Sequence, residues 1–268
     1  MTALDERLAL LTERLAGLGS VVVAFSGGVD SALLLDVAFE VLGDGALAAT
    51  ARSHTLPERE LSAAQRFCAE RNIAHVVLDT NELAVEGFRD NPPNRCYLCK
   101  RELYGRLAAL AASRGFRAVV EGSNLDDEGD YRPGLTALAE LGVISPLREQ
   151  GFTKDDVRSL SHIRGLPTWN KPSSACLASR LPYGMPITPE TLARVEAAET
   201  WLIDAGLVQV RVRAHGDVAR IECDEEGMAL LTERRLARQA HDALRGLGFT
   251  FVALDLGGFE SGSMNRAL

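Results

Sequence analysis

Along the first half of the chain, short hydrophobic runs alternate with stretches whose apolar positions recur at helical spacing. Apolar runs bounded by turn residues predict buried strands, and the stretches between them predict helices. Strands separated by helices form βαβ units, so the pattern predicts a parallel sheet with both faces covered. We expect strands over residues 21–25, 46–51, 73–78 and 117–121, and helices over residues 31–42, 57–71 and 96–113.

The second half is organised differently. Five prolines fall between residues 165 and 189 and indicate a boundary, which we place after residue 172. Beyond it, the pattern predicts a helix over 189–205, strands over 207–213 and 218–223, a helix over 225–244 and a strand over 250–254. The fold expected is therefore α/β, a doubly wound parallel sheet with a second, smaller α+β domain.

Composition limits the class of protein. The chain has 268 residues, of which 46% are hydrophobic and 25% charged, which is typical of a globular protein and excludes collagen-like and disordered chains. Its net charge of -8 argues against a nucleic acid or an anionic membrane as partner. No apolar run approaches the ~18 residues of a membrane helix, and the first residues form an amphipathic helix rather than a signal peptide. We therefore expect a cytoplasmic protein.

A glycine-rich turn, Ser26-Gly27-Gly28-Val29-Asp30-Ser31, joins the first predicted strand to a helix. The glycines permit a tight turn and a close approach of ligand to backbone, and the helix N-terminus attracts anions. With the hydroxyls of Ser26 and Ser31, the turn predicts a phosphate-binding loop, in which Asp30 organises Mg²⁺. No lysine follows the glycines, so it is not a Walker loop. The alternatives are a plain tight connection and, for Asp30, a helix cap.

An acidic stretch follows the fourth predicted strand, from Glu121 to Asp127 and on to Gly134. The carboxyl ends of parallel strands meet at one edge of the sheet, where ligands bind. We expect Asp126 to face the same phosphates and Mg²⁺ as the glycine loop; a solvated acidic loop is the alternative.

The five cysteines favour thiol or metal chemistry over disulfides, because their number is odd and no export signal precedes them. Cys96 and Cys99 form a CxxC pair at a helix start, typical of a redox pair or of two metal ligands. Cys176, in the proline-rich connector, is the candidate third ligand. Three thiolates would leave one iron of a [4Fe–4S] cluster open. Cys68 and Cys223 lie in amphipathic elements, where we expect them to pack in the core.

Together these motifs resemble the LarE family, ATP-dependent sulfur transferases that build the nickel-pincer nucleotide of lactate racemase. SGGVDS alone resembles only the wider pyrophosphatase-loop (PP-loop) ATPase superfamily, with its adenine nucleotide alpha hydrolase-like fold. The segments that carry the resemblance are SGGVDS (26–31), NPPNRCYLCK (91–100), EGSNLDDEGDYRPG (121–134), CLASRLPYG (176–184), RVRAHGDVARIE (211–222) and GSMN (262–265).

The resemblance implies ATP, Mg²⁺ and a small nucleotide substrate, pyridinium-3,5-biscarboxylic acid mononucleotide. ATP would adenylate a carboxylate, and sulfur would then displace AMP. In single-cysteine members of the family, the residue matching Cys176 is itself the donor and becomes dehydroalanine. This chain also carries Cys96 and Cys99, which favours the branch that holds a [4Fe–4S] cluster on three cysteines. The resemblance further implies an ATP-binding domain over 1–172 and a homo-oligomer such as a hexamer.

The second domain offers candidates for binding the substrate's phosphate. Arg211 and Arg213 project from one face of a predicted strand, about 6.6 Å apart, and Arg180 is a third candidate. Exposed strand arginines are commonly just solvated, and the family resemblance is what favours the phosphate role. Glu199 is a candidate Mg²⁺ ligand on the preceding helix, although an exposed helical glutamate is the simpler interpretation.

Three other functions remain open at this level. A tRNA thiolase would share the ATP loop and a three-cysteine cluster, but it would need a basic surface for tRNA. An amide-forming ligase would leave the cysteines unexplained. A non-catalytic ATP- or cluster-sensing module would bind ATP without releasing pyrophosphate.

Overall fold

The computed structural model describes residues 2–129, 133–260 and 262–264. The chain divides into two compact units. The first comprises Met1–Glu82 and Cys96–Ser173, and the second comprises Leu83–Arg95 and Ser174–Leu268. Residues 83–95 thus group with the C-terminal part of the chain, a feature that no shift in composition indicates.

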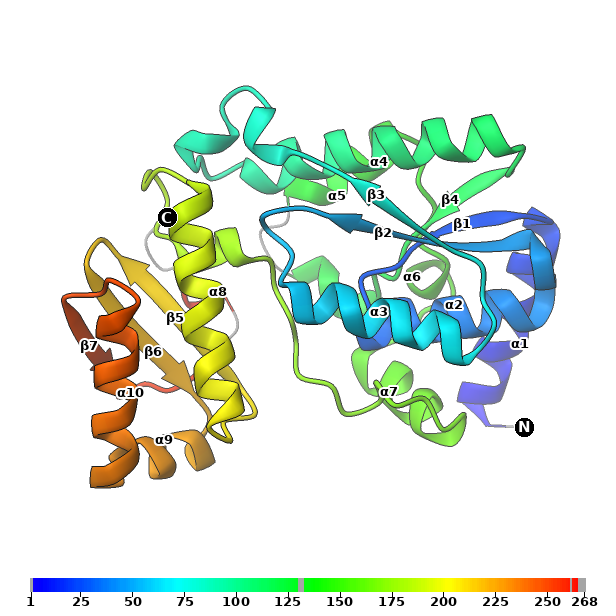
Figure 1. The fold of residues 1–268 in the computed structure, drawn as a ribbon. Helices are drawn as coiled ribbons and strands as arrows, with labels where there is room; N and C mark the ends of the chain where they lie inside the picture. The colour runs from blue at the N-terminus through cyan, green and yellow to red at the C-terminus, as the bar shows by residue number, and fades with distance from the viewer. Residues whose placement is uncertain (1, 130–132, 261, 265–268) are drawn as a thin grey trace. The chain divides into compact units, whose positions relative to one another are not determined.

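The first unit contains the predicted parallel sheet (Figure 1). Its strands are β1 (Val21–Ala24), β2 (Ala46–Arg52), β3 (His75–Asp79) and β4 (Ala118–Val120). They lie in the order β3-β2-β1-β4, and every neighbouring pair is parallel. The central strand β1 is short and apolar because both of its faces are buried, which explains its continuous run of valines. The expected α/β class is confirmed.

Helices cover both faces of this sheet. Val21 and Val23 pack on one side with apolar residues of α1, α2, α3 and α7, whereas Val22 packs on the other with residues of α4 and α5 (Figure 1). In the described residues no helix is both long and apolar enough to span a membrane. The helices of this unit are α1 (Ala3–Leu18), α2 (Val29–Leu42), α3 (Glu58–Glu70), α4 (Arg95–Arg114), α5 (Pro133–Glu140), α6 (Pro146–Glu149) and α7 (Lys154–Ile163).

The second unit is built on a small mixed sheet. Strand β5 (Val210–His215) pairs antiparallel with β6 (Val218–Cys223), and β6 pairs parallel with β7 (Phe251–Leu254). Helices α8 (Pro189–Asp204) and α10 (Arg234–Gly246) pack against this sheet and against each other.

Two sequence predictions for this unit were wrong in detail. The expected helix over 225–244 is two helices, α9 (Glu225–Thr232) and α10, because the backbone at Glu233 is extended. The strand expected from residue 207 begins at Val210. Val208 does not share the buried face of the other valines, since 64% of its surface is exposed.

Residues 83–95 hold the second unit together from within. The fully buried Asn91 donates its side-chain amide to the carbonyl of Pro182 at 2.7 Å, and its own carbonyl accepts from Gly184 at 3.0 Å. Arg95 donates to the Asn91 side chain at 2.7 Å and lies over the ring of Tyr183. The segment therefore forms part of the core of a unit whose other residues come eighty positions later.

Candidate functional site

The glycine loop occupies the turn between β1 and α2. Gly27 has a φ of +72°, a conformation that favours glycine, and Gly28 is the N-cap of α2. The hydroxyls of Ser26 and Ser31 lie 3.2 Å apart, and Ser31 also donates to the Gly28 carbonyl at 3.2 Å. These contacts hold the turn from inside, while the first-turn amides of α2 remain at the helix end that attracts anions.

The end of β4 lies directly against the start of α2. A Cβ atom added to Gly122 would be 2.8 Å from the amide nitrogen of Ser31 and 3.0 Å from the carbonyl carbon of Asp30. Just beyond, Asn124 donates to a carboxylate oxygen of Asp30 at 2.9 Å. The glycine loop and the segment after β4 therefore meet at one edge of the sheet.

Lys154 joins the two predicted acids at this edge. Its ammonium lies 2.5 Å from Asp30, and its backbone N–H donates to Asp126 at 2.7 Å. Lys154 is the first residue of α7, and Thr153 and Asp156 form a capping box that fixes the start of this helix. Sequence reasoning missed Lys154; the Thr-Lys-Asp-Asp run marks a helix start but not what that start faces.

A second lysine that sequence reasoning missed reaches the loop from the connector. The ammonium of Lys171 donates to the Gly27 carbonyl at 2.9 Å and to Glu60 on α3 at 2.7 Å. From α7, Arg158 donates to the carbonyl of Lys171 at 3.2 Å. The glycine loop is therefore bordered by two cations, although no lysine stands in the loop itself.

The CxxC pair lies at the start of α4. Cys96 and Cys99 are three positions apart in its first turn, so they share one side of the helix, and both are half-buried. They belong to the first unit, whereas Cys176 belongs to the second. Within the described ranges, no three cysteine, histidine or acidic side chains gather closely enough to hold a metal ion.

Cys68 and Cys223 are core residues, as the sequence predicted. Burial raises the pKa of the Cys68 thiol to about 12 and that of Cys223 to about 11. Both remain protonated at neutral pH, which makes them poor nucleophiles and poor metal ligands.

Cys176 is exposed and immediately precedes the 3-10 helix η5 (Leu177–Arg180). Its carbonyl accepts from the Ser179 hydroxyl at 2.7 Å and from Arg180 at 3.1 Å, and Arg180 also donates to the Ala175 carbonyl at 2.7 Å. The backbone around Cys176 is thus fixed, although its side chain is open to solvent.

Arg180 is itself held by Glu199 on α8. The guanidinium donates twice to this carboxylate, at 2.8 and 2.9 Å, and only 1% of Arg180 is exposed. Glu199 also accepts from the backbone N–H of Val212 at 2.9 Å. The expectation of an exposed helical glutamate was wrong, because Glu199 compensates a buried guanidinium at the base of the Cys176 segment.

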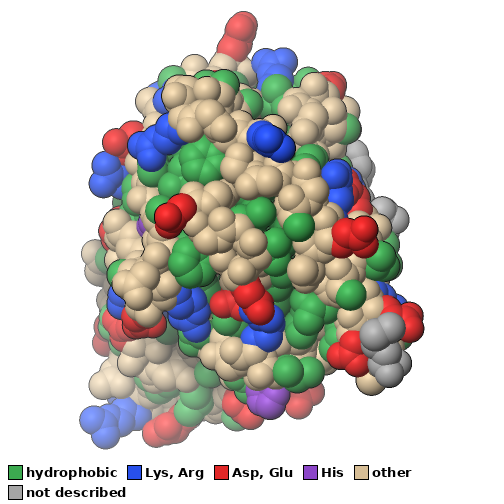
Figure 2. All heavy atoms as spheres, turned by 90° about the vertical axis from the view of Figure 1, so that its right-hand side faces the viewer, with side chains coloured by type: hydrophobic (Ala, Val, Ile, Leu, Met, Phe, Trp, Pro, Cys, Tyr) green, Lys and Arg blue, Asp and Glu red, His purple; other side chains and the backbone are tan. Residues whose placement is uncertain are grey.

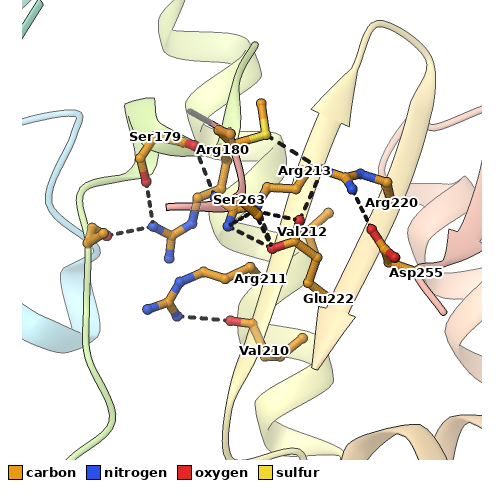
Figure 3. Close-up of polar contacts among 12 residues, drawn as sticks. Ser179, Arg180, Val210, Arg211, Val212, Arg213, Arg220, Glu222, Asp255 and Ser263 are labelled. Carbon is orange, nitrogen blue, oxygen red and sulfur yellow. Dashed lines mark hydrogen bonds and ion pairs between the residues drawn. The ribbon is translucent and has the colours of Figure 1, made fainter. Parts of the chain in front are cut away.

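Arg213 is buried and paired, so it is not a solvated strand arginine. It donates to Glu222 on β6 at 2.9 and 2.7 Å, to the Ser179 carbonyl at 3.0 Å and to Ser263 at 3.1 Å. Arg220 and Asp255 extend the same network, as Figure 3 shows.

Arg211 is also buried and lies on the same face of β5. Its guanidinium donates to the Val210 carbonyl at 3.0 Å and sits 5.3 Å from the ring centre of Phe259. The three arginines expected to bind phosphate therefore come together around the Cys176 segment (Figure 3). Arg180 already donates to Glu199 and Arg213 to Glu222, so only part of the hydrogen-bonding capacity of each guanidinium is left for a phosphate.

The surface shown in Figure 2 carries basic and acidic side chains interspersed, with hydrophobic ones between them. This face does not present the continuous basic area that binding to tRNA would require. Two of the sequence motifs extend beyond the described residues, at positions 130–132 and 265.

Several known proteins are similar to this chain over part or all of its length. No family model matches the chain. It is 42% identical over 273 residues to the pyridinium-3,5-bisthiocarboxylic acid mononucleotide synthase of Lactiplantibacillus plantarum, covering 100% of this chain and 97% of that protein. It is 43% identical over 265 residues to an uncharacterized protein of Synechocystis, covering 99% of each. It is also 27% identical over 196 residues to a tRNA-specific 2-thiouridylase of Desulforamulus reducens, covering 58% of this chain and 53% of that enzyme.

Proposed function

Because this chain belongs to the LarE family of ATP-dependent sulfur transferases, we propose that it converts the carboxylates of pyridinium-3,5-biscarboxylic acid mononucleotide into thiocarboxylates. The observation that carries this proposal is the 42% identity to the Lactiplantibacillus plantarum synthase, which extends over the whole chain. The glycine loop bordered by Asp30 and Lys154 supplies the site that such an ATP-dependent reaction needs.

The first step is adenylation at the glycine loop. A carboxylate oxygen of the substrate attacks the α-phosphorus of ATP, the bond to the β-phosphate bridging oxygen breaks, and pyrophosphate leaves. The first-turn amides of α2 and the hydroxyls of Ser26 and Ser31 bind the departing pyrophosphate, with Gly27 and Gly28 allowing its close approach. Lys154 neutralises charge on the phosphates, since its ammonium stands beside the loop.

Asp30 and Asp126 are the residues that would hold Mg²⁺. Asp30 contacts the ammonium of Lys154 and Asp126 accepts from its backbone N–H, so both lie at the same edge of the sheet, and oxygen ligands of this kind suit a hard cation. When bound, Mg²⁺ neutralises the phosphate oxygens. Asn124 keeps the Asp30 carboxylate oriented.

The second step is attack by sulfur. A sulfur nucleophile adds to the carbonyl carbon of the acyl adenylate, the carbon–oxygen bond to AMP breaks, and AMP leaves with the electron pair. Cys96, Cys99 and Cys176 would hold a [4Fe–4S] cluster, because their three thiols match its thiolate donor set and two of them share one helix turn. When bound, the cluster supplies an iron site for sulfide.

Arg211 and Arg213 bind the substrate's phosphate in this proposal. They lie on one face of β5 beside the Cys176 segment, where paired guanidiniums suit a mononucleotide phosphate. Arg180 also holds the carbonyls of Ala175 and Cys176, and its contact with the phosphate stays a prediction.

One experiment distinguishes the two sulfur sources. The wild-type protein and the Cys96→Ala and Cys68→Ala variants are purified without oxygen and examined by absorption and EPR spectroscopy. A cluster signal in the wild type and in Cys68→Ala, but not in Cys96→Ala, is expected. A colourless protein whose Cys176 peptide loses the mass of H₂S after turnover would mean that Cys176 itself is the donor.

A second experiment tests the reaction class. Pyrophosphate release from ATP is expected to depend on the pyridinium substrate and to accompany thiocarboxylate formation. ATP binding without pyrophosphate release would favour a sensing module instead. Tight tRNA binding that weakens steeply with salt would favour a tRNA thiolase. Cytoplasmic location and assembly into a homo-oligomer stay predictions.

A further inference from the structure

Lys171 contacts the phosphate loop through the loop's own backbone. Its ammonium donates to the carbonyl of Gly27, the residue whose positive φ makes the turn. The same ammonium is paired with Glu60, and both side chains are largely buried, with 20% and 12% of their surfaces exposed. This contact ties Lys171, and with it the connector, to the glycine turn.

Lys171 also begins the segment that leads to Cys176. Its carbonyl accepts from Arg158, which donates to the carbonyl of Trp169 as well, so the chain is fixed to the first unit up to this point. The carbonyls of Ala175 and Cys176 are fixed in turn by Arg180. Residues 172–174 are the short link between these two attachments.

The length of this link limits how far the sulfur can be from the loop. Cys176 lies five positions after Lys171, a span of at most about 18 Å in a fully extended chain. This bound follows from the covalent chain and holds for any arrangement of the two units. Without the contact to Gly27, Arg158 would still hold the backbone of Lys171 at α7, but the connector would no longer be attached to the loop itself.

We propose that Lys171 is a positioning residue, which keeps the connector attached at the phosphate loop so that sulfur meets the acyl adenylate before water does. The proposal rests on the proposed function. It assigns Lys171 to the transfer step and leaves adenylation to the loop, Lys154 and the carboxylates. Loss of the attachment therefore uncouples the two steps: the adenylate still forms, but it is hydrolysed to AMP and the original carboxylate.

The test compares the full-length wild type with the Lys171→Met/Glu60→Gln double variant. Changing both residues avoids leaving the Glu60 carboxylate buried without its cation. Three products are measured with ATP and the pyridinium substrate: pyrophosphate, thiocarboxylate and, with hydroxylamine added, the hydroxamate that traps the acyl adenylate. We expect hydroxamate formation near the wild-type rate, and about tenfold less thiocarboxylate per pyrophosphate.

Glu60→Gln alone is the matched control, because it removes the ion pair and keeps the donation from Lys171 to Gly27. It is expected to retain the wild-type ratio of thiocarboxylate to pyrophosphate. The proposal is overturned if Glu60→Gln lowers the ratio as much as the double variant does, or if the double variant loses all three products in proportion. A wild-type protein that releases no pyrophosphate with the substrate would instead refute the proposed function.

Discussion

The pair formed by Arg180 and Glu199 allows a quantitative test of what holds the Cys176 segment. Glu199→Ala removes the acceptor of two charged hydrogen bonds and of the Val212 amide bond, and it leaves a guanidinium that is 1% exposed. Breaking a buried pair from one side costs about 3–5 kcal/mol, because the remaining charge stays desolvated. We expect the free energy of unfolding of the second unit to fall by that amount.

The chain offers a reporter for this unit. It contains two tryptophans, of which Trp169 lies in the first unit and Trp201 in α8 of the second. In a Trp169→Phe background, urea unfolding followed by tryptophan fluorescence reports on the surroundings of Trp201. With an m-value of about 2 kcal/mol per M, the midpoint should move by about 2 M.

A double variant completes the test. Arg180→Leu/Glu199→Leu leaves neither charge in the interior, so it should recover most of the stability lost in Glu199→Ala. It should not recover sulfur transfer, because the guanidinium that donates to the Ala175 and Cys176 carbonyls is gone. A loss below about 1 kcal/mol for Glu199→Ala, the size expected of an exposed pair, would refute the reasoning.

Three further predictions concern the first unit. Gly122→Ala places a Cβ atom 2.8 Å from the Ser31 amide nitrogen, so it should lower the free energy of unfolding by about 1–3 kcal/mol and raise the KM for ATP. Gly105→Ala is the control: an added Cβ there meets no atom within 4 Å, so neither effect is expected. Lys154→Met should raise the KM for ATP in pyrophosphate release, and an unchanged KM would exclude a phosphate contact for Lys154. Burial alone would raise the pKa of Asp156, but hydrogen bonds from Thr153 and the charge of Arg7 hold this pKa below 3.8. The stabilisation by Asp156 is therefore present above pH 3.8 and is lost as the pH falls through the pKa of the folded state. In Asp156→Asn, the free energy of unfolding should fall less steeply between pH 5 and pH 3 than it does in the wild type. Equal pH dependence in the two proteins would contradict this reasoning.

The parts of the fold that sequence predicts are those set by local patterns. The continuous valines of β1 predict a strand that is buried on both faces, as it is. The two glycines predict a tight turn, and Gly27 adopts the positive φ that such a turn needs. The break at Glu233 was missed because the apolar spacing continues through it, while its extended backbone interrupts the helix.

The missing parts of the site depend on contacts between distant residues. Lys154 and Lys171 reach the loop from positions more than 120 residues beyond it, and nothing in their own segments marks that contact. The buried state of Arg213 depends on the register of β5 with β6, which places Glu222 within reach. Side-chain type alone could not distinguish these residues from solvated ones.

The insertion of residues 83–95 into the second unit has a consequence for biosynthesis. Asn91 cannot find its partners at Pro182 and Gly184 until about ninety more residues have been made, several seconds at about 5–20 residues per second. Until then, residues 83–95 lack the hydrogen-bond partners that the C-terminal part of the chain supplies. A fragment beginning at Ser174 would lack Phe88 and Asn91, so the second unit should not fold as a continuous excised piece.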